Sequence, residues 1–154
     1  MKLYKKVLLA IGIMFIAIQF FRPSRNVNAA LLQTDITNTI DVPEPVMAVL
    51  KNSCYDCHSN NTRYPWYMNI QPIAWFLANH IKDGKKNLNF SEFGSYSLRR
   101  RQNKLKAIAE EAESGDMPLS SYTMIHSGAK LSDSEKKLIN DWAQSTSDKL
   151  SANK

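Results

Sequence analysis

The sequence predicts a small all-α domain preceded by one apolar helix, and two observations support this fold class. None of the 154 residues lies in a stretch that alternates apolar and polar side chains, as a half-buried strand would. Apolar residues instead recur at helical spacing in four stretches, each of which begins or ends at a proline, a glycine or a capping residue. We therefore divide the chain into an N-terminal membrane anchor or signal (1–26), a polar tether (27–42), a helical domain (43–146) and a polar tail (147–154).

The N-terminal segment has the order of charged and apolar residues that export signals and membrane anchors share. Three lysines among the first six residues precede an uncharged run from Val7 to Phe21, and Arg22 follows it. The run is shorter than the about 20 residues of a typical span, although its flanking residues can extend it. Val27-Asn28-Ala29 resembles a cleavage site but lies far from the run, so we expect an uncleaved signal-anchor. With the lysines inside, this single transmembrane helix places the domain in the periplasm.

The first two helices of the domain are predicted from prolines at their starts and from their apolar faces. One begins at Pro43, since proline suits the first turn, and its apolar face leads into the two cysteines of the chain. The second runs from about Pro72 to Asp83 and is expected to stop at Gly84. Its inner face would be Ile73, Phe76, Leu77, His80 and Ile81.

The last two helices have clear capping signals. One runs from about Ser97 to Ser114 and ends before Gly115. The other starts with the capping box Ser132-Asp133-Ser134-Glu135, in which each side chain satisfies a free backbone N–H of the first turn. Its apolar face carries Leu138, Ile139 and Trp142.

The strongest motif of the chain follows the first of these helices. Residues 54–58 read Cys54-Tyr55-Asp56-Cys57-His58, which is the C-x-x-C-H attachment signature of c-type haem. The two thiols can add across the two vinyl groups of haem, and the histidine beside the second link can be the proximal iron ligand. The motif therefore predicts one haem c per chain, bound covalently by Cys54 and Cys57 and ligated through His58.

Three other interpretations of the cysteine pair remain open. A thioredoxin-like redox pair would normally sit in a βαβ setting, and no strand pattern surrounds this motif. Half of a zinc site would need His80 and His126 as further ligands, and their spacing fits no zinc finger. A structural disulfide is compatible with an exported domain.

The sixth iron ligand and the walls of the haem pocket are predicted from the rest of the domain. Met117 lies before Pro118 in the loop between the last two helices, where small cytochromes c carry an axial thioether. The alternatives are Met124, His80 and His126. Aromatic residues after the motif would form the pocket wall, and an arginine among them could reach a haem propionate; these are Trp66, Tyr67, Trp75 and Arg63.

A helix before C-x-x-C-H and an amphipathic helix at the C-terminus form the frame of a small cytochrome c. More closely, the chain resembles the cytochrome-c-like haem-binding domain family of Bacteroidetes-type bacteria over roughly residues 45–144. The segments that carry the resemblance are Cys54–Ser59, Tyr64–Tyr67, Gln71–Trp75, Asn89–Ser91, Met117-Pro118, Ser121-Tyr122 and His126. The resemblance implies a membrane-tethered protein with a single haem.

These features favour an electron carrier over an enzyme. We expect single-electron transfer to a redox partner protein at the outer face of the cytoplasmic membrane, to which residues 7–21 would attach the chain. The alternative is a haem-based sensor or peroxidase-like enzyme with an open sixth position, in which His80 or His126 would act with Arg63. The net charge of +6 includes three lysines of the anchor, so the domain is only mildly basic and nothing indicates nucleic-acid binding.

Overall fold

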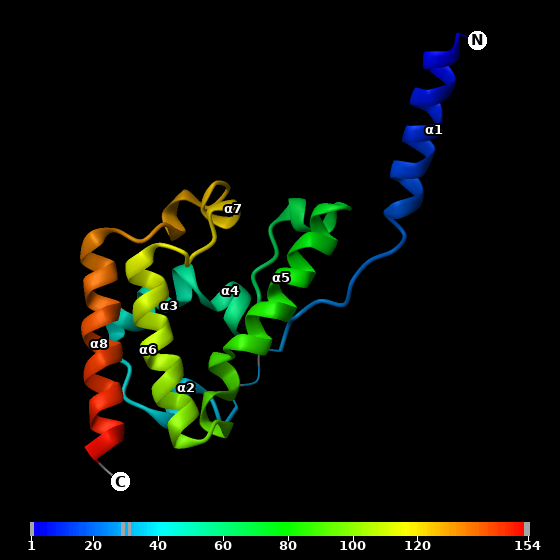
Figure 1. Ribbon diagram of the computed structural model, residues 1–154. Helices are drawn as coiled ribbons and strands as arrows, with labels where there is room; N and C mark the ends of the chain where they lie inside the picture. The colour runs from blue at the N-terminus through cyan, green and yellow to red at the C-terminus, as the bar shows by residue number, and fades with distance from the viewer. Residues whose placement is uncertain (1, 29, 31, 153–154) are drawn as a thin grey trace.

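The computed structural model describes residues 2–28, 30 and 32–152, and the secondary structure of that part is helical (Figure 1). The possible cleavage site includes Ala29, which lies outside the described residues. Within them, strand-like pairing is limited to an isolated bridge between Val27 and Asn61. The predicted all-α class is confirmed by the elements α1 (Leu3–Ile18), α2 (Ile36–Thr39), α3 (Glu44–Ser53), α4 (Tyr55–His58), η1 (Trp66–Asn69), α5 (Ile73–Asn87), η2 (Phe90–Ser95), α6 (Leu98–Ser114), α7 (Ser120–Thr123), η3 (Ser127–Ala129) and α8 (Asp133–Ala152).

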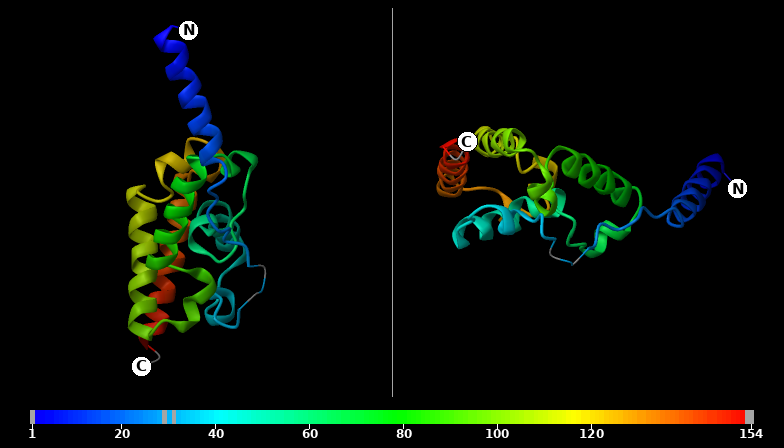
Figure 2. Two further views of the ribbon diagram at one scale, coloured as in Figure 1. Left: turned by 90° about the vertical axis from the view of Figure 1, so that its right-hand side faces the viewer. Right: turned by 90° about the horizontal axis from the view of Figure 1, so that it is seen from below.

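The core of the domain lies where α6 and α8 pack side by side and antiparallel (Figures 1 and 2). Both predicted ends of α6 are confirmed, since the Ser97 side chain caps its first turn and Gly115 follows its last with φ 81°. The capping box of α8 is also confirmed, because the Glu135 carboxylate accepts from the Ser132 backbone N–H at 2.8 Å. Small and branched side chains let the two helices approach closely, among them Leu105, Ala109, Ala112, Ile139 and Ala143.

Helix α3 joins this core and ends at the haem motif. Its predicted start is confirmed, because Pro43 precedes its first residue. Val46 and Leu50 are buried in the core, and α3 contacts α8, as the frame of a small cytochrome c requires. The chain bends at Cys54, which has φ −123°, and then forms the single turn of α4. Packing of α3 against the core therefore determines the position at which the C-x-x-C-H motif begins.

Helix α5 extends beyond the end that the sequence predicts. Gly84 lies inside α5, and the helix ends at Asn87. A Cβ atom at position 84 would lie 2.7 Å from the carbonyl oxygen of Cys57, which no side chain could accept without movement of the backbone. Glycine at this position therefore serves close packing of α5 on α4 rather than helix termination.

The N-terminal helix begins before the predicted apolar run and ends before that run does. Helix α1 ends at Ile18, has no buried residue and stands away from the domain (Figures 1 and 2). Among the described residues, no helix combines the length and the apolar character that crossing a membrane requires. The membrane-spanning role of residues 7–21 stays a prediction.

The segments expected to be a polar tether and a polar tail are structured where they are described. The backbone N–H of Asn28 donates to the Asn60 carbonyl oxygen at 2.9 Å, and Ile36 of α2 is fully buried in the core. At the other end, α8 continues through Ala152, and Ser147 is buried. The described parts of the tether and the tail thus pack against the domain, through Ile36 in the first and Leu150 in the second.

Candidate haem site

The two cysteines and the histidine of the motif lie on one helical turn. Cys54 is at the junction of α3 and α4, and its carbonyl oxygen accepts from the backbone N–H groups of Cys57 at 3.2 Å and His58 at 3.0 Å. Both cysteines are half-buried free thiols. The turn is also held from outside, because the Thr62 hydroxyl donates to the Asp56 carbonyl oxygen at 2.6 Å. The structure therefore presents the three predicted haem-binding side chains together.

His58 is oriented as a metal ligand would be. Its Nδ1 donates to the carbonyl oxygen of Leu88 at 3.0 Å. A carbonyl can only accept, so the proton is on Nδ1 and the lone pair of Nε2 is left for a metal. Burial of the ring, in T-shaped contact with Phe90, lowers the His58 pKa and favours the neutral form that binds iron. This is the arrangement that typically orients the imidazole of a metal-binding histidine.

The thiols lack the electrostatic environment of a redox-active pair. Burial, and secondly the charge of the other thiolate, raises the pKa of Cys54 to about 12. Burial, and secondly Asp56, raises the pKa of Cys57 to about 11. Reactive dithiols instead have lowered thiol pKa values, so the thioredoxin-like interpretation loses support. For the zinc interpretation, no three His, Cys, Asp or Glu side chains converge on one point within the described part of the chain.

An apolar face of α5 begins beside residues 54–58, which we call the haem-binding turn. Ile73, Phe76, Leu77 and His80 lie at helical spacing above Gly84, which contacts Cys57. Phe76 is 53% exposed, although a large apolar side chain on an amphipathic helix is normally covered. The flat apolar body of a porphyrin would cover such a face. The donor set, the orientation of His58 and this face together fit a haem.

The predicted pocket residues make separate contacts of their own. Trp75 is nine positions before Gly84, which is roughly 180° around the helix, and its Nε1 donates to the Phe21 carbonyl oxygen at 2.7 Å. Trp66 is 75% exposed on η1 and meets Tyr67 edge to face. Arg63 is paired with Asp56 at 3.1 Å, and its side chain is 64% exposed. These residues lie close together in the sequence. Proximity along the chain, however, does not determine the direction in which each side chain points.

The four candidate sixth ligands differ in how free their donor atoms are. His126 has both ring nitrogens engaged, since Nδ1 donates to the Tyr122 carbonyl oxygen at 3.2 Å and Nε2 accepts from the Tyr67 hydroxyl at 2.6 Å. His80 uses only Nδ1, which donates to the Phe76 carbonyl oxygen at 2.9 Å. Met117 is 36% exposed and Met124 is 81% exposed. His126 is therefore the least available of the four.

Asp56, inside the motif, and Tyr122, from a distant segment, form a contact that the sequence does not predict. Asp56, between the two cysteines, is 7% exposed and accepts hydrogen bonds from Arg63 and from the Tyr122 hydroxyl. The pairing with Arg63, seven residues later, could have been suspected from opposite charge. The contact with Tyr122 spans 66 residues and has no local signal.

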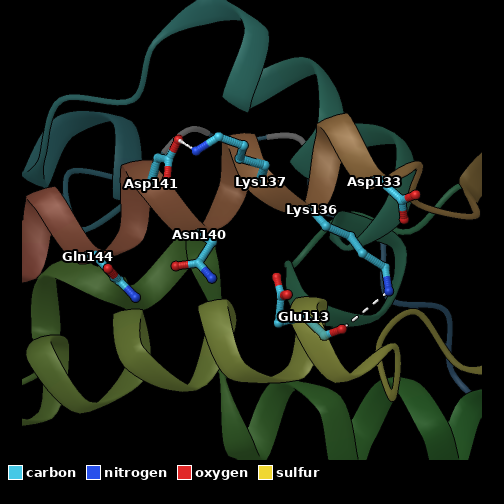
Figure 3. Close-up of a pocket in the computed structure, with 7 residues that line it drawn as sticks. All are labelled: Glu113, Asp133, Lys136, Lys137, Asn140, Asp141 and Gln144. Atoms are coloured by element: carbon cyan, nitrogen blue, oxygen red, sulfur yellow. Dashed lines mark hydrogen bonds and ion pairs between the residues drawn. The ribbon is translucent and has the colours of Figure 1, made fainter.

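A separate surface groove between α6 and α8 does not belong to this site (Figure 3). The Lys136 ammonium donates to the Glu113 carbonyl oxygen at 3.2 Å, and Lys137 pairs with Asp141 at 2.8 Å. Its other lining residues are also polar, and none comes from the haem-binding turn; they are Asp133, Asn140 and Gln144. The groove is a solvated face of the helix pair.

A helical domain that presents two cysteines and an oriented histidine on one turn defines the class of haem-binding proteins. Comparison with protein-family models gives the same class, because residues 13–145 match the haem-binding domain family. The chain belongs to this family, and the predicted recognition is confirmed. Searches of curated proteins and of solved structures found no significant match.

The close approach at Gly84 leads to a first testable prediction. We expect Gly84→Ala to destabilise the domain by about 1–3 kcal/mol, because the added methyl group would press on the backbone of the haem-binding turn. Urea unfolding of the purified protein measures this. Gly128→Ala is the matched control, since a Cβ atom there meets nothing within 4 Å. Equal stability of the two variants would contradict the close packing of α5 on α4.

Proposed function

We propose that this protein is a c-type cytochrome that carries one covalently attached haem c and transfers single electrons. The observation that supports it most is the His58 imidazole, whose Nδ1 donates to the Leu88 carbonyl oxygen while Cys54 and Cys57 stand on the same turn. Cys54 and Cys57 would form the thioether links, and the Nε2 atom of His58 would be the proximal ligand. The haem supplies the one-electron chemistry when bound.

We propose an electron carrier rather than an enzyme because the arginine and one of the two histidines that a peroxidase could use are engaged elsewhere. The Arg63 guanidinium is held by Asp56, and both nitrogens of His126 are hydrogen-bonded. His80 keeps its Nε2 free, but it would lack the free arginine that a peroxidase pairs with a distal base. The protein's own contribution is to orient His58, to cover the haem with apolar side chains and to exclude water.

Carbon monoxide binding distinguishes an electron carrier from a sensor or a peroxidase-like enzyme. In an electron carrier with two axial protein ligands, the visible spectrum of the reduced protein should change slowly or little when carbon monoxide is added. A reversible one-electron redox titration should accompany this result. Immediate and complete binding of carbon monoxide would instead show an open sixth position and would overturn the proposal.

We further propose that the chain acts at the outer face of the cytoplasmic membrane and passes electrons to a protein partner. The lysines among the first six residues and the exposed apolar surface of α1 support this location. Mass spectrometry of the mature N-terminus, together with alkaline extraction of membranes, tests it. A chain that begins near residue 30 and is released by alkali would show a cleaved signal instead.

A further inference from the structure

The carboxylate of Asp56 is saturated by hydrogen bonds beneath the haem-binding turn. Oδ1 accepts from the Arg63 backbone N–H at 3.0 Å and from its Nε at 3.1 Å. Oδ2 accepts from Nη2 of the same arginine at 3.1 Å and from the Tyr122 hydroxyl at 2.7 Å. Three of these four bonds stay within ten residues of the motif. The fourth joins the turn to a distant segment of the chain.

That distant segment is the loop between α6 and α8, residues 115–132, which contains α7. It lies beside α4 in Figure 1, and it carries both methionines that are candidates for the sixth ligand. Tyr122 lies between Met117 and Met124. The hydroxyl of Tyr122 therefore attaches this loop to the turn that carries His58, the predicted proximal ligand.

Two further hydrogen bonds tie the same loop to the segment around the motif. The Tyr67 hydroxyl donates to Nε2 of His126 at 2.6 Å, and the ring of His126 stacks on Tyr122 with centroids 4.2 Å apart. The Asn52 side chain donates to the Gly128 carbonyl oxygen at 2.5 Å. Of the three ties, only the bond from Tyr122 ends on a buried carboxylate, and hydrogen bonds to charged groups are the stronger kind.

We propose that the Tyr122–Asp56 hydrogen bond is a clamp that holds loop 115–132 closed over the haem. The inference rests on the proposed function, since it requires a haem on Cys54 and Cys57. Tyr122 and Asp56 are positioning residues, because neither would touch the iron. The clamp sets where the sulfur donors of the loop lie and how often the loop opens to admit a small ligand from solvent.

Tyr122→Phe removes the clamp with little change of shape. Loss of a hydrogen bond to a buried carboxylate should raise the open population of the loop by about tenfold or more. Carbon monoxide should then bind to the reduced holoprotein about tenfold faster, as stopped-flow absorbance measures. In the oxidised protein, the near-infrared absorption of a sulfur-ligated iron should weaken, which a purely structural role of Tyr122 would not cause.

Tyr64→Phe is the matched control. It removes a hydroxyl that accepts from the Asn26 backbone N–H at 2.8 Å and so ties the N-terminal segment instead of the loop. Its rate of carbon monoxide binding should equal that of the wild type. Urea unfolding of both variants separates local opening from global destabilisation. An equal acceleration in the two variants, or one that follows global stability, would overturn the clamp.

The failure of the clamp can be distinguished from the failure of the proposed function. If the wild-type protein keeps no haem after denaturation, the proposed function is wrong. If it keeps haem and Tyr122→Phe binds carbon monoxide at the wild-type rate, only the clamp is wrong.

Discussion

Replacing both Cys54 and Cys57 by alanine is expected to make the haem extractable. The wild-type protein, denatured in detergent and separated on a gel, should retain haem peroxidase staining, and acid acetone should leave the colour with the protein. The double variant should lose both properties, because only the Nε2 atom of His58 and apolar contacts would then hold the haem. The effect should be all or none, since a covalent link survives denaturation and a coordination bond does not.

The single variants serve as controls for this prediction. Cys54→Ala and Cys57→Ala each leave one thiol on the turn. Each single variant that acquires haem should therefore keep it through one thioether. The α-band of the reduced pyridine complex should shift for the singles, because one vinyl group stays unsaturated. Release of haem from the wild type by acid acetone would contradict covalent attachment and leave a non-covalent haem protein, which family membership alone allows.

The parts of the fold that the sequence predicts correctly are those with local causes. Gly115 ends α6 and the Ser132 capping box starts α8, because capping depends on side chains within a few residues of the helix end. The motif at residues 54–58 is likewise local, so its three side chains are found together on one turn. Local chemistry of this kind needs no knowledge of the rest of the chain.

The structure differs from the sequence prediction where contacts between distant parts of the chain determine the conformation. Glycine often ends a helix, yet Gly84 lies inside α5, where a Cβ atom would lie 2.7 Å from the Cys57 carbonyl oxygen. Ile36 lies in a polar stretch, yet the core covers it completely. Trp75 belongs to an aromatic cluster in sequence, yet it faces away from the haem-binding turn and donates to the Phe21 carbonyl oxygen. In each case the partner lies more than twenty residues away, and periodicity carries no information about it.

The choice of the sixth ligand illustrates how the structure narrows a sequence prediction. His126 remains a reasonable candidate from sequence, because it flanks the loop before the last helix. Its two nitrogens are nevertheless occupied by Tyr122 and Tyr67, and ligation would break the bond to Tyr67. His80 keeps a free Nε2 on the apolar face of α5. The methionines of the loop keep their sulfur atoms free of such constraints.

Met117→Ala is expected to change the iron environment more than any other substitution in the loop. Met117 precedes Pro118, whose fixed φ and missing N–H limit how the loop can fold. Its backbone N–H donates to the Glu111 carbonyl oxygen at 3.1 Å, so its Cα is fixed at the end of α6. A donor held in this way loses less freedom on ligation than the 81% exposed Met124. Thioether ligation favours reduced iron and raises the potential relative to two histidines.

The oxidised Met117→Ala protein should therefore lose the weak near-infrared sulfur-to-iron band, and its reduction potential should fall. Met124→Ala is the matched control and should leave both nearly unchanged, because its side chain is mostly in solvent. A wild-type protein without this band, in which His80→Ala rather than Met117→Ala alters the spectrum, would assign the sixth position to histidine. That outcome is physically distinct, because the Nε2 atom of His80 is on α5 and its ligation would not depend on how loop 115–132 is held.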